Sequence, residues 1–263
     1  MRAYFSLARG AFQAFLAYRS GFIFTILNNL IYLGIAFYLW RSIFQGRETL
    51  RGLTFNQTFL YVALASSIFV MLKTWTDWDM AHQIREGGII MTLVKPLNLQ
   101  YYFLAQSAGF SIGNFLSITF PSLLALIFVF KVTIEPGIGL LFFPVAIVFA
   151  FLLNSVIDYM IGLTSFYTES IWGISSTKEI MILFLSGSLI PIPFFPEGMQ
   201  RVLSFLPFQA MYHLPLSMII DPVRPAMEFV QVMIVQVFWV GILFIASQLY
   251  YRQAVKVLRV SGG

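Results

Sequence analysis

Long stretches without a charged side chain dominate the pattern of residues along the chain. Such stretches, free of Asp, Glu, Lys and Arg, cover residues 20–40, 52–72, 96–130, 136–157 and 229–251, with a shorter one at 180–196. A helix needs about 20 mostly apolar residues to cross the hydrocarbon core of a bilayer. The pattern therefore predicts six membrane-spanning helices near residues 22–40, 57–75, 103–130, 139–166, 180–195 and 227–250.

The composition supports the same class of protein. Hydrophobic residues make up 59% of the 263 residues and charged residues 10%, against about 25% charged residues in soluble domains. We therefore expect an all-α polytopic membrane protein that forms one transmembrane domain over residues 1–263. The basic start continues into the first apolar stretch without a cleavage motif, so that span is expected to be retained. The absence of cysteine excludes disulfides and thiolate metal sites.

Lysine and arginine are unevenly distributed over the connections between the predicted spans. Ten of them fall on one side: Arg2, Arg9, Arg19, Lys73, Arg85, Lys95, Lys178, Arg252, Lys256 and Arg259. Six fall on the other: Arg41, Arg47, Arg51, Lys131, Arg201 and Arg224. The positive-inside rule then predicts that both termini are cytoplasmic. The net charge of +5 is explained by this orientation and by anionic lipids, so lipids and not nucleic acid are the expected partners.

Residues 2–19 have the pattern of an interfacial helix. Phe5, Ala8, Phe12 and Phe15 recur at helical spacing, while polar residues such as Arg9 occupy another face. The sequence predicts a helix that lies along the membrane plane. The alternative is that the first span simply starts earlier.

The connection after the second span, residues 76–100, contains a short amphipathic helix from Thr76 to Glu86. Thr76 is its expected cap, and the pair Gly87-Gly88 is expected to end it. One face carries apolar side chains and another carries charged ones, which favours docking of a partner protein. The candidate docking residues are Asp79, Met80, His82, Ile84, Arg85 and Glu86.

Residues 190–225 are apolar yet rich in proline, with seven of the eleven prolines between residues 191 and 225. Proline breaks helices, and broken backbone at membrane depth is stable only where protein or a water-filled cavity surrounds it. We therefore expect an extracellular re-entrant hairpin between spans 5 and 6, with a short helix near residues 197–205. Its candidate gate residues are Pro191, Pro193, Phe194, Phe195, Pro196, Phe205 and Pro207.

The run SIWGISSTKEIMILFLSGSLIPIPFFPEGMQRVLSFLPFQAMYHLPL resembles the fifth-span region of ABC-2 type permeases, the six-helix membrane subunits of type V ABC exporters. The elements REGGI and LVKPLN resemble their cytoplasmic coupling region. The resemblance implies ATP-driven export by a dimer of permeases, same or related, bound to two ATPase subunits. No G-x-x-x-x-G-K-[ST] loop occurs here, so ATP and Mg are expected on the partner ATPase and no cofactor on this chain.

The resemblance also implies roles for individual segments. Met80 and Ile84 would supply buried contact with the ATPase, and Arg85 and Glu86 would orient it. The prolines and phenylalanines of residues 190–225 would form a packed outer lid, and spans 1, 2 and 5 would line the pathway. The composition suits an amphiphilic or hydrophobic substrate. The size and the separate-subunit design indicate a bacterial inner membrane.

Ionisable residues within spans are costly and usually face the bundle interior or a cavity. Asp158, with Asn154 on the same face, is a candidate inner gate, and a structural hydrogen bond to another helix is the alternative.

An ion-gradient-driven secondary transporter is the competing class of protein. Such carriers commonly contain broken spans at matching positions in both halves, whereas this sequence has one strongly broken region. An intramembrane enzyme would need a nucleophile and base, for which Ser186, Ser188 and His213 offer no recognisable motif. The pair Asp77 and Asp79 is better explained by the positive dipole end at the start of a helix than by a metal site.

Overall fold

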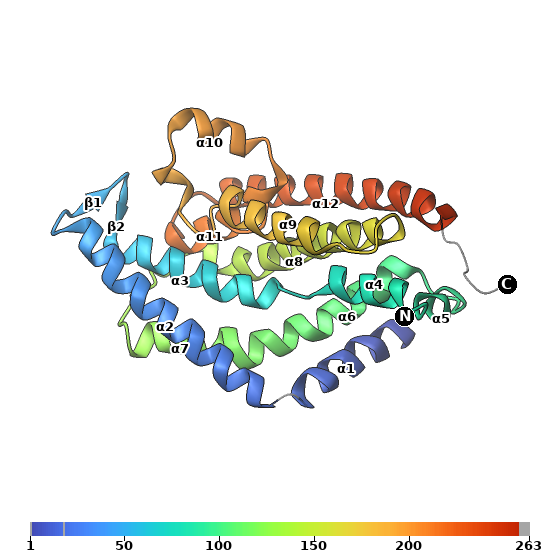
Figure 1. Ribbon diagram of the computed structural model, residues 1–263. Coiled ribbons are helices and arrows are strands. Elements are labelled where there is room, and N and C mark those ends of the chain that lie inside the picture. Colours follow the sequence, from blue (N-terminus) through green and yellow to red (C-terminus); the bar gives the residue numbers. More distant parts are fainter. Residues whose placement is uncertain (1, 18, 258–263) are drawn as a thin grey trace.

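The computed structural model describes residues 2–17 and 19–257, which are almost entirely helical (Figure 1). Residues 1, 18 and 258–263, which include the Arg259 assigned to the cytoplasmic side, lie outside the described residues. The amino-terminal half contains α1 (Arg2–Ala17), α2 (Arg19–Phe44), β1 (Thr49–Leu50), β2 (Leu53–Thr54), α3 (Phe55–Leu72), α4 (Thr76–Arg85), α5 (Ile89–Leu93), α6 (Leu99–Asn114), the π-helix η1 (Phe115–Thr119) and α7 (Phe120–Phe128). The remainder contains α8 (Gly139–Leu163), η2 (Thr164–Phe166), α9 (Trp172–Leu185), η3 (Ile192–Phe194), α10 (Glu197–Ser204), η4 (Pro207–Ala210), α11 (His213–Ile220), α12 (Ala226–Ala254) and η5 (Val255–Val257).

The all-α polytopic fold is confirmed. Five helical segments of the described residues are long and apolar enough to cross a membrane: Ile23–Phe44, Phe55–Arg85, Leu99–Phe128, Gly139–Phe166 and Ala226–Val257. The predicted span at 180–195 differs, because α9 begins earlier, at Trp172, and has 14 residues. Such a helix is about 21 Å long, shorter than the hydrocarbon core of about 30 Å. Gly187, with a φ of +80°, follows the end of α9, so a sixth crossing stays a prediction.

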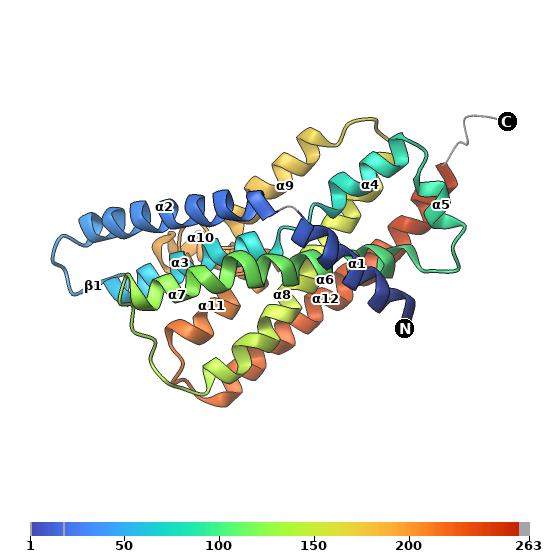
Figure 2. The same cartoon turned by 90° about the horizontal axis from the view of Figure 1, so that it is seen from below.

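The amino-terminal helix α1 is separate from α2 and runs in a different direction (Figure 2). It packs along α6, where Gly109 and Gly113 allow the two helices to approach closely because they have no side chain. A Cβ atom on Gly109 would lie 2.2 Å from the carbonyl oxygen of Ala8, and one on Gly113 would lie 2.3 Å from the ring of Phe15. The alternative in which the first span simply starts earlier is therefore wrong, while the position of α1 along the membrane plane stays a prediction.

Helix α3 is the most enclosed of the five long segments. It is surrounded by α2, η1, α7 and α11, and its side chains form the centre of the largest apolar core. Polar contacts cross this core as well, since Asn29 of α2 donates hydrogen bonds to Ser122 of α7 at 2.7 Å and to Ser67 of α3 at 3.4 Å.

The proline-rich segment after α9 forms η3, the short helix α10 and the returning pieces η4 and α11. The short helix predicted near residues 197–205 is confirmed as α10, Glu197–Ser204. Gln57 of α3 donates to the carbonyl oxygen of Ile220 at 3.2 Å, and Gln236 of α12 donates to that of Ala210 at 2.8 Å. These bonds hold the return segment against the bundle, whereas its re-entrant position in a bilayer stays a prediction.

Candidate functional site

The chain bends sharply between α3 and α4. Trp75 adopts a left-handed conformation with a φ of 56°, which ends the regular geometry after α3 and lets α4 start in a new direction at Thr76. The expected side-chain cap by Thr76 is wrong, because Trp75 precedes the helix and no side chain caps it. The hydroxyl of Thr76 instead lies 2.6 Å from that of Ser107 and so holds the start of α4 against α6.

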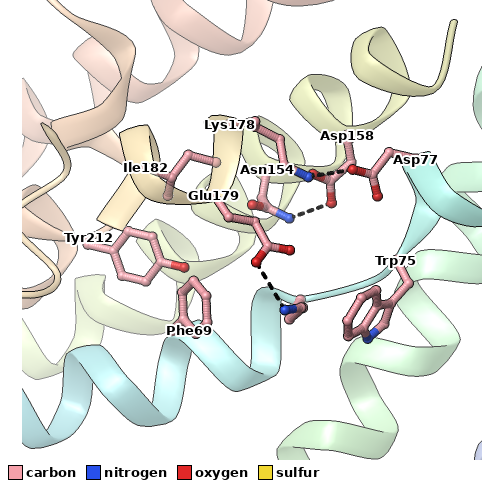
Figure 3. A pocket seen from close by; sticks show the side chains of 10 residues that line it. Phe69, Trp75, Asp77, Asn154, Asp158, Lys178, Glu179, Ile182 and Tyr212 are labelled. Atoms are coloured by element: carbon pink, nitrogen blue, oxygen red, sulfur yellow. Dashed lines mark hydrogen bonds and ion pairs between the residues drawn. The ribbon is translucent and has the colours of Figure 1, made fainter. Parts of the chain in front are cut away.

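A buried cluster of charges lies directly beside this bend (Figure 3). The Nζ atom of Lys178 on α9 lies 2.7 Å from Oδ2 of Asp77 on α4 and 2.8 Å from Oδ1 of Asp158 on α8. The three side chains are only 9%, 2% and 5% exposed, respectively. One ammonium group therefore joins three helices that are far apart in the sequence.

Neutral groups complete the hydrogen bonding of the two carboxylates. Ser175 donates to Asp77 at 2.5 Å, and Thr74 donates to Asp158 at 3.1 Å. Asn154 donates to Asp158 at 3.0 Å and also to the carbonyl oxygen of Leu72, the last residue of α3, at 2.8 Å. Buried charges are stable only when they are paired and hydrogen-bonded in this way. The cluster thus fixes the end of α3 and the start of α4 against α8 and α9.

A second ion pair borders the cluster and is more exposed. Lys73 lies 3.2 Å from Glu179, and its Nζ atom also lies 4.1 Å from the centroid of the Trp75 ring. The cavity between the two pairs has a volume of about 20 Å³, which is room for about one water molecule. In the described part of the chain, no group of three or more His, Asp or Glu side chains is placed to hold a metal ion.

The predicted gate residues Asn154 and Asp158 are both part of this cluster. Their hydrogen bonds to α3 and to the residues before α4 agree with the structural alternative that the sequence left open. The sequence reasoning missed their partners, because it assigned Asp77 to a helix start and counted Lys178 only as a topological charge. A signal was available in α9, where Ser175 and Lys178 are three residues apart and therefore share a face.

The predicted docking residues of α4 separate onto two faces. Asp79, His82, Arg85 and Glu86 are exposed, and Ile84 is half-buried. Met80 is completely buried and faces α8, where a Cβ atom on Gly162 would lie 2.8 Å from its sulfur atom. The expected contact of Met80 with a partner is therefore wrong, since this side chain faces the bundle.

The predicted outer gate is only partly packed. Phe195 is buried with Ile192 and Leu203, and the ring of Phe194 lies 5.0 Å from that of Trp40. Pro191 is buried, Pro193 and Pro207 are half-buried, and Pro196 is exposed. Phe205 is 79% exposed, so its expected place in a packed lid is wrong. The reason is that α10 buries Leu203, and the side chain two residues later points away from the core.

A hollowed face lies along α2 and α3. One of its cavities, of about 470 Å³, extends to α9, and the adjoining one, of about 480 Å³, extends to α1, α6 and η1. The two cavities share Thr25, Asn28, Phe69 and Val70. We call this surface the hollowed face between α2, α3 and α9. Asn28 is exposed there, on a helix that is long and apolar enough to cross a membrane. A polar side chain at membrane depth usually faces protein or a water-filled cavity, so this face is a candidate pathway or contact surface.

These observations define a multi-pass helical membrane protein with a buried polar cluster that attaches the short helix α4 to the bundle. The profile of one family, described as ABC-2 family transporter protein, matches residues 30–262 of the chain. The chain therefore belongs to the ABC-2 transporter family. Among curated proteins, none matches the chain.

Proposed function

We propose that this chain is the permease subunit of an ATP-driven exporter that moves an amphiphilic or hydrophobic substrate out of the cytoplasm. Its membership of the ABC-2 family supports a transport role. ATP and Mg would bind to two separate ATPase subunits, because the chain has no nucleotide-binding loop. The proposed location is a bacterial inner membrane with six crossings. Five would be the long helical segments, and the additional crossing, fifth along the chain, would use α9 together with the segment that follows it.

Both termini are proposed to be cytoplasmic. The beginning of α1, helices α4 and α5 and the end of α12 lie toward the same end of the bundle (Figures 1 and 2). Ten of the sixteen lysines and arginines were assigned to that side from the sequence. The proline-rich segment with Phe194 and Phe195 would then close the opposite, outer end.

A second permease, identical or related, would cover the hollowed face between α2, α3 and α9. The two open cavities and the exposed amide of Asn28 support this assignment. Thr25 and Ser66 add further polar groups to the same face. The substrate would pass between the two copies, and the apolar walls with a few polar groups would suit an amphiphile.

Helix α4 would transmit the action of the ATPase. Its exposed residues Asp79, His82, Arg85 and Glu86 would contact the ATPase, with Ile84 at the edge of a groove of about 350 Å³ formed with residues 165–169. Its other face is held to the bundle by Met80 and by Asp77. The observation that carries the proposal is that α4 exposes charged side chains on one face and is joined to the bundle on the other by the buried ion pair of Asp77 with Lys178. Displacement of α4 would therefore move α8 and α9 with it.

The test combines Arg85→Ala with Glu86→Ala in the complex with the ATPase. Loss of charged contacts at an interface weakens binding by about tenfold for each 1.4 kcal/mol. We expect ATPase stimulation and substrate transport to fall by about tenfold or more, while the permease stays folded. The matched control is Arg47→Ala with Glu48→Ala, an equally exposed pair in the loop before β1.

Unchanged ATPase stimulation in the Arg85/Glu86 variant would contradict the docking assignment. Transport in proteoliposomes is the second measurement. Solute movement driven by an ion gradient, with the chain alone and no ATPase, would contradict the export proposal as a whole.

A further inference from the structure

The two cavities of the hollowed face differ in their lining. The cavity of about 480 Å³ is lined by Lys73 and Trp75, which connect α3 to α4, and we call it the inner cavity. The cavity of about 470 Å³ extends along α2 as far as Ile35, and we call it the outer cavity. Among the described residues, Lys73 is the only charged one that lines either cavity. The hollowed face thus carries a positive group at one end and no charge along the rest.

The ammonium group of Lys73 is only partly paired within the chain. The side chain is 29% exposed, and Nζ lies 3.2 Å from a carboxylate oxygen of Glu179 and 4.1 Å from the centroid of the Trp75 ring. Trp75 is itself 54% exposed. An ammonium group has three N–H donors, and in the described part of the chain Glu179 is the only side chain that accepts from this one. Lys73 therefore has donors left for a ligand.

Glu179 lines neither cavity of the hollowed face. It lies on α9 and borders the small cavity beside the buried cluster. Its pair with Lys73 is half-exposed, and pairs of this exposure contribute little to stability because water and salt screen both charges. An anion that enters the inner cavity can therefore replace Glu179 as the partner of Lys73 without disrupting the bundle.

The outer cavity suits an alkyl chain. Its wall along α2 includes Ile31 and Ile35, and Leu189 lines the side that follows α9. From Thr25, which lines both cavities, to Ile35 the helix rises about 15 Å. In the proposed orientation the charged end is cytoplasmic and the apolar end reaches into the membrane. A lipid of the inner leaflet has the same order of polar and apolar parts.

We propose that the hollowed face binds an amphiphile with a negatively charged headgroup, held by Lys73 in the inner cavity, and with its chain along α2 in the outer cavity. This assignment rests on the export role proposed above and narrows its substrate class to anionic amphiphiles. Binding exchanges the carboxylate of Glu179 for the anion of the ligand. The ion pair between the end of α3 and α9 is therefore lost when the substrate binds.

The experiment compares three probes with chains of equal length and different charge. Oleoyl lysophosphatidic acid is anionic, monooleoylglycerol is neutral and oleylamine is cationic. The purified permease in a neutral detergent is titrated with each probe, and native mass spectrometry gives the number bound and the apparent affinity. We expect the anionic probe to bind about tenfold or more tightly than the other two, as one hydrogen bond to a charged group predicts. Glycerol 3-phosphate, which has no chain, should not compete with it.

Two variants should change the affinity for the anionic probe in opposite directions. Lys73→Met should abolish the preference for the anion. Glu179→Gln removes the competing carboxylate and should tighten binding of the anionic probe by about two- to tenfold. The matched control is Lys95→Met, because Lys95 also lies beside an aromatic ring, 5.6 Å from the centroid of Tyr102, but lines neither cavity. It should bind the probes like the wild-type chain.

The assignment is overturned if the wild-type chain shows no preference for the anionic probe, or if Lys73→Met retains it. Weaker binding of the anionic probe to Glu179→Gln would also overturn it, as would competition by glycerol 3-phosphate, which indicates a site for free phosphate. These measurements use the permease without the ATPase. A failure of this assignment is thus distinct from a failure of the export role, which the transport and ATPase assays test.

Discussion

Replacement of Lys178 by Met tests whether the buried cluster holds the bundle together. The methionine side chain has a similar length and no charge, so the packing changes little while the carboxylates of Asp77 and Asp158 lose their shared partner. Lys178 lies within 2.8 Å of both of them. Removing one partner from a buried ion pair typically costs about 3–5 kcal/mol, because the remaining charge has no compensation. We expect the free energy of unfolding of Lys178→Met to fall by that amount.

The cluster has a formal charge of −1, with two carboxylates and one ammonium group, and this makes the expected effects asymmetric. Asp158→Asn leaves a neutral pair of Asp77 and Lys178, so its cost should be limited to weakened hydrogen bonds, about 1–2 kcal/mol. The triple variant Asp77→Asn, Asp158→Asn, Lys178→Met contains no buried charge. It should be within about 1 kcal/mol of the wild-type chain, since neutral replacement of a whole buried cluster is often tolerated.

The assay is denaturant unfolding of the purified protein in detergent, followed by circular dichroism and by tryptophan fluorescence. Lys73→Met is the control, because the side chains of Lys73 and Glu179 are 29% and 30% exposed. A pair with this exposure should contribute at most about 1 kcal/mol. The reasoning is refuted if Lys178→Met costs no more than Lys73→Met, or if the triple variant is as unstable as Lys178→Met.

Two further changes test how α1 and the proline-rich segment are attached. Gly109→Ala should destabilise the contact of α1 with α6 by about 1–3 kcal/mol through overpacking. The control is Gly34→Ala, whose added Cβ atom would meet no atom within 4 Å, and it should be neutral or slightly stabilising in the same unfolding assay. Gln236→Leu removes the hydrogen bonds to Ala146 and Ala210 and should cost about 1–3 kcal/mol. It should also speed maleimide labelling of an added Ala210→Cys, because that position is only 1% exposed and becomes accessible when the segment loosens, whereas Gln231→Leu on the exposed side of α12 should not. The chain has no other cysteine to react. Equal labelling rates would contradict the attachment by Gln236.

The sequence was sufficient for most of the helical framework, because long apolar stretches have few alternatives in a bilayer. It was less informative where helix length depends on local backbone geometry. The predicted span at 180–195 did not anticipate the earlier start of α9 at Trp172 or its end at Leu185. Gly187 and Pro191 mark the end of this helix, but nothing nearby in the sequence marks its beginning.

The site illustrates a different limit. The sequence identified Asp158 as unusual, since a carboxylate in a span is rare, but it could not identify Lys178 as its partner. The two residues lie on different helices, and Asp77 lies on a third. Helical spacing relates residues within one helix and says nothing of which helices are neighbours. The same limit explains Met80, whose position on the apolar face of α4 was correct but whose partner is α8 and not another protein.

The attachment of α4 also has a consequence for attempts to exchange parts between related permeases. Although α4 follows α3 in the chain, most of the groups that hold it, apart from Ser107 of α6, belong to α8 and α9, about 80 to 100 positions later. A chimaera that received only residues 76–86 from a relative would combine a foreign helix with the original Asp158 and Lys178. The natural unit of exchange is therefore discontinuous, and it includes the facing turns of both later helices.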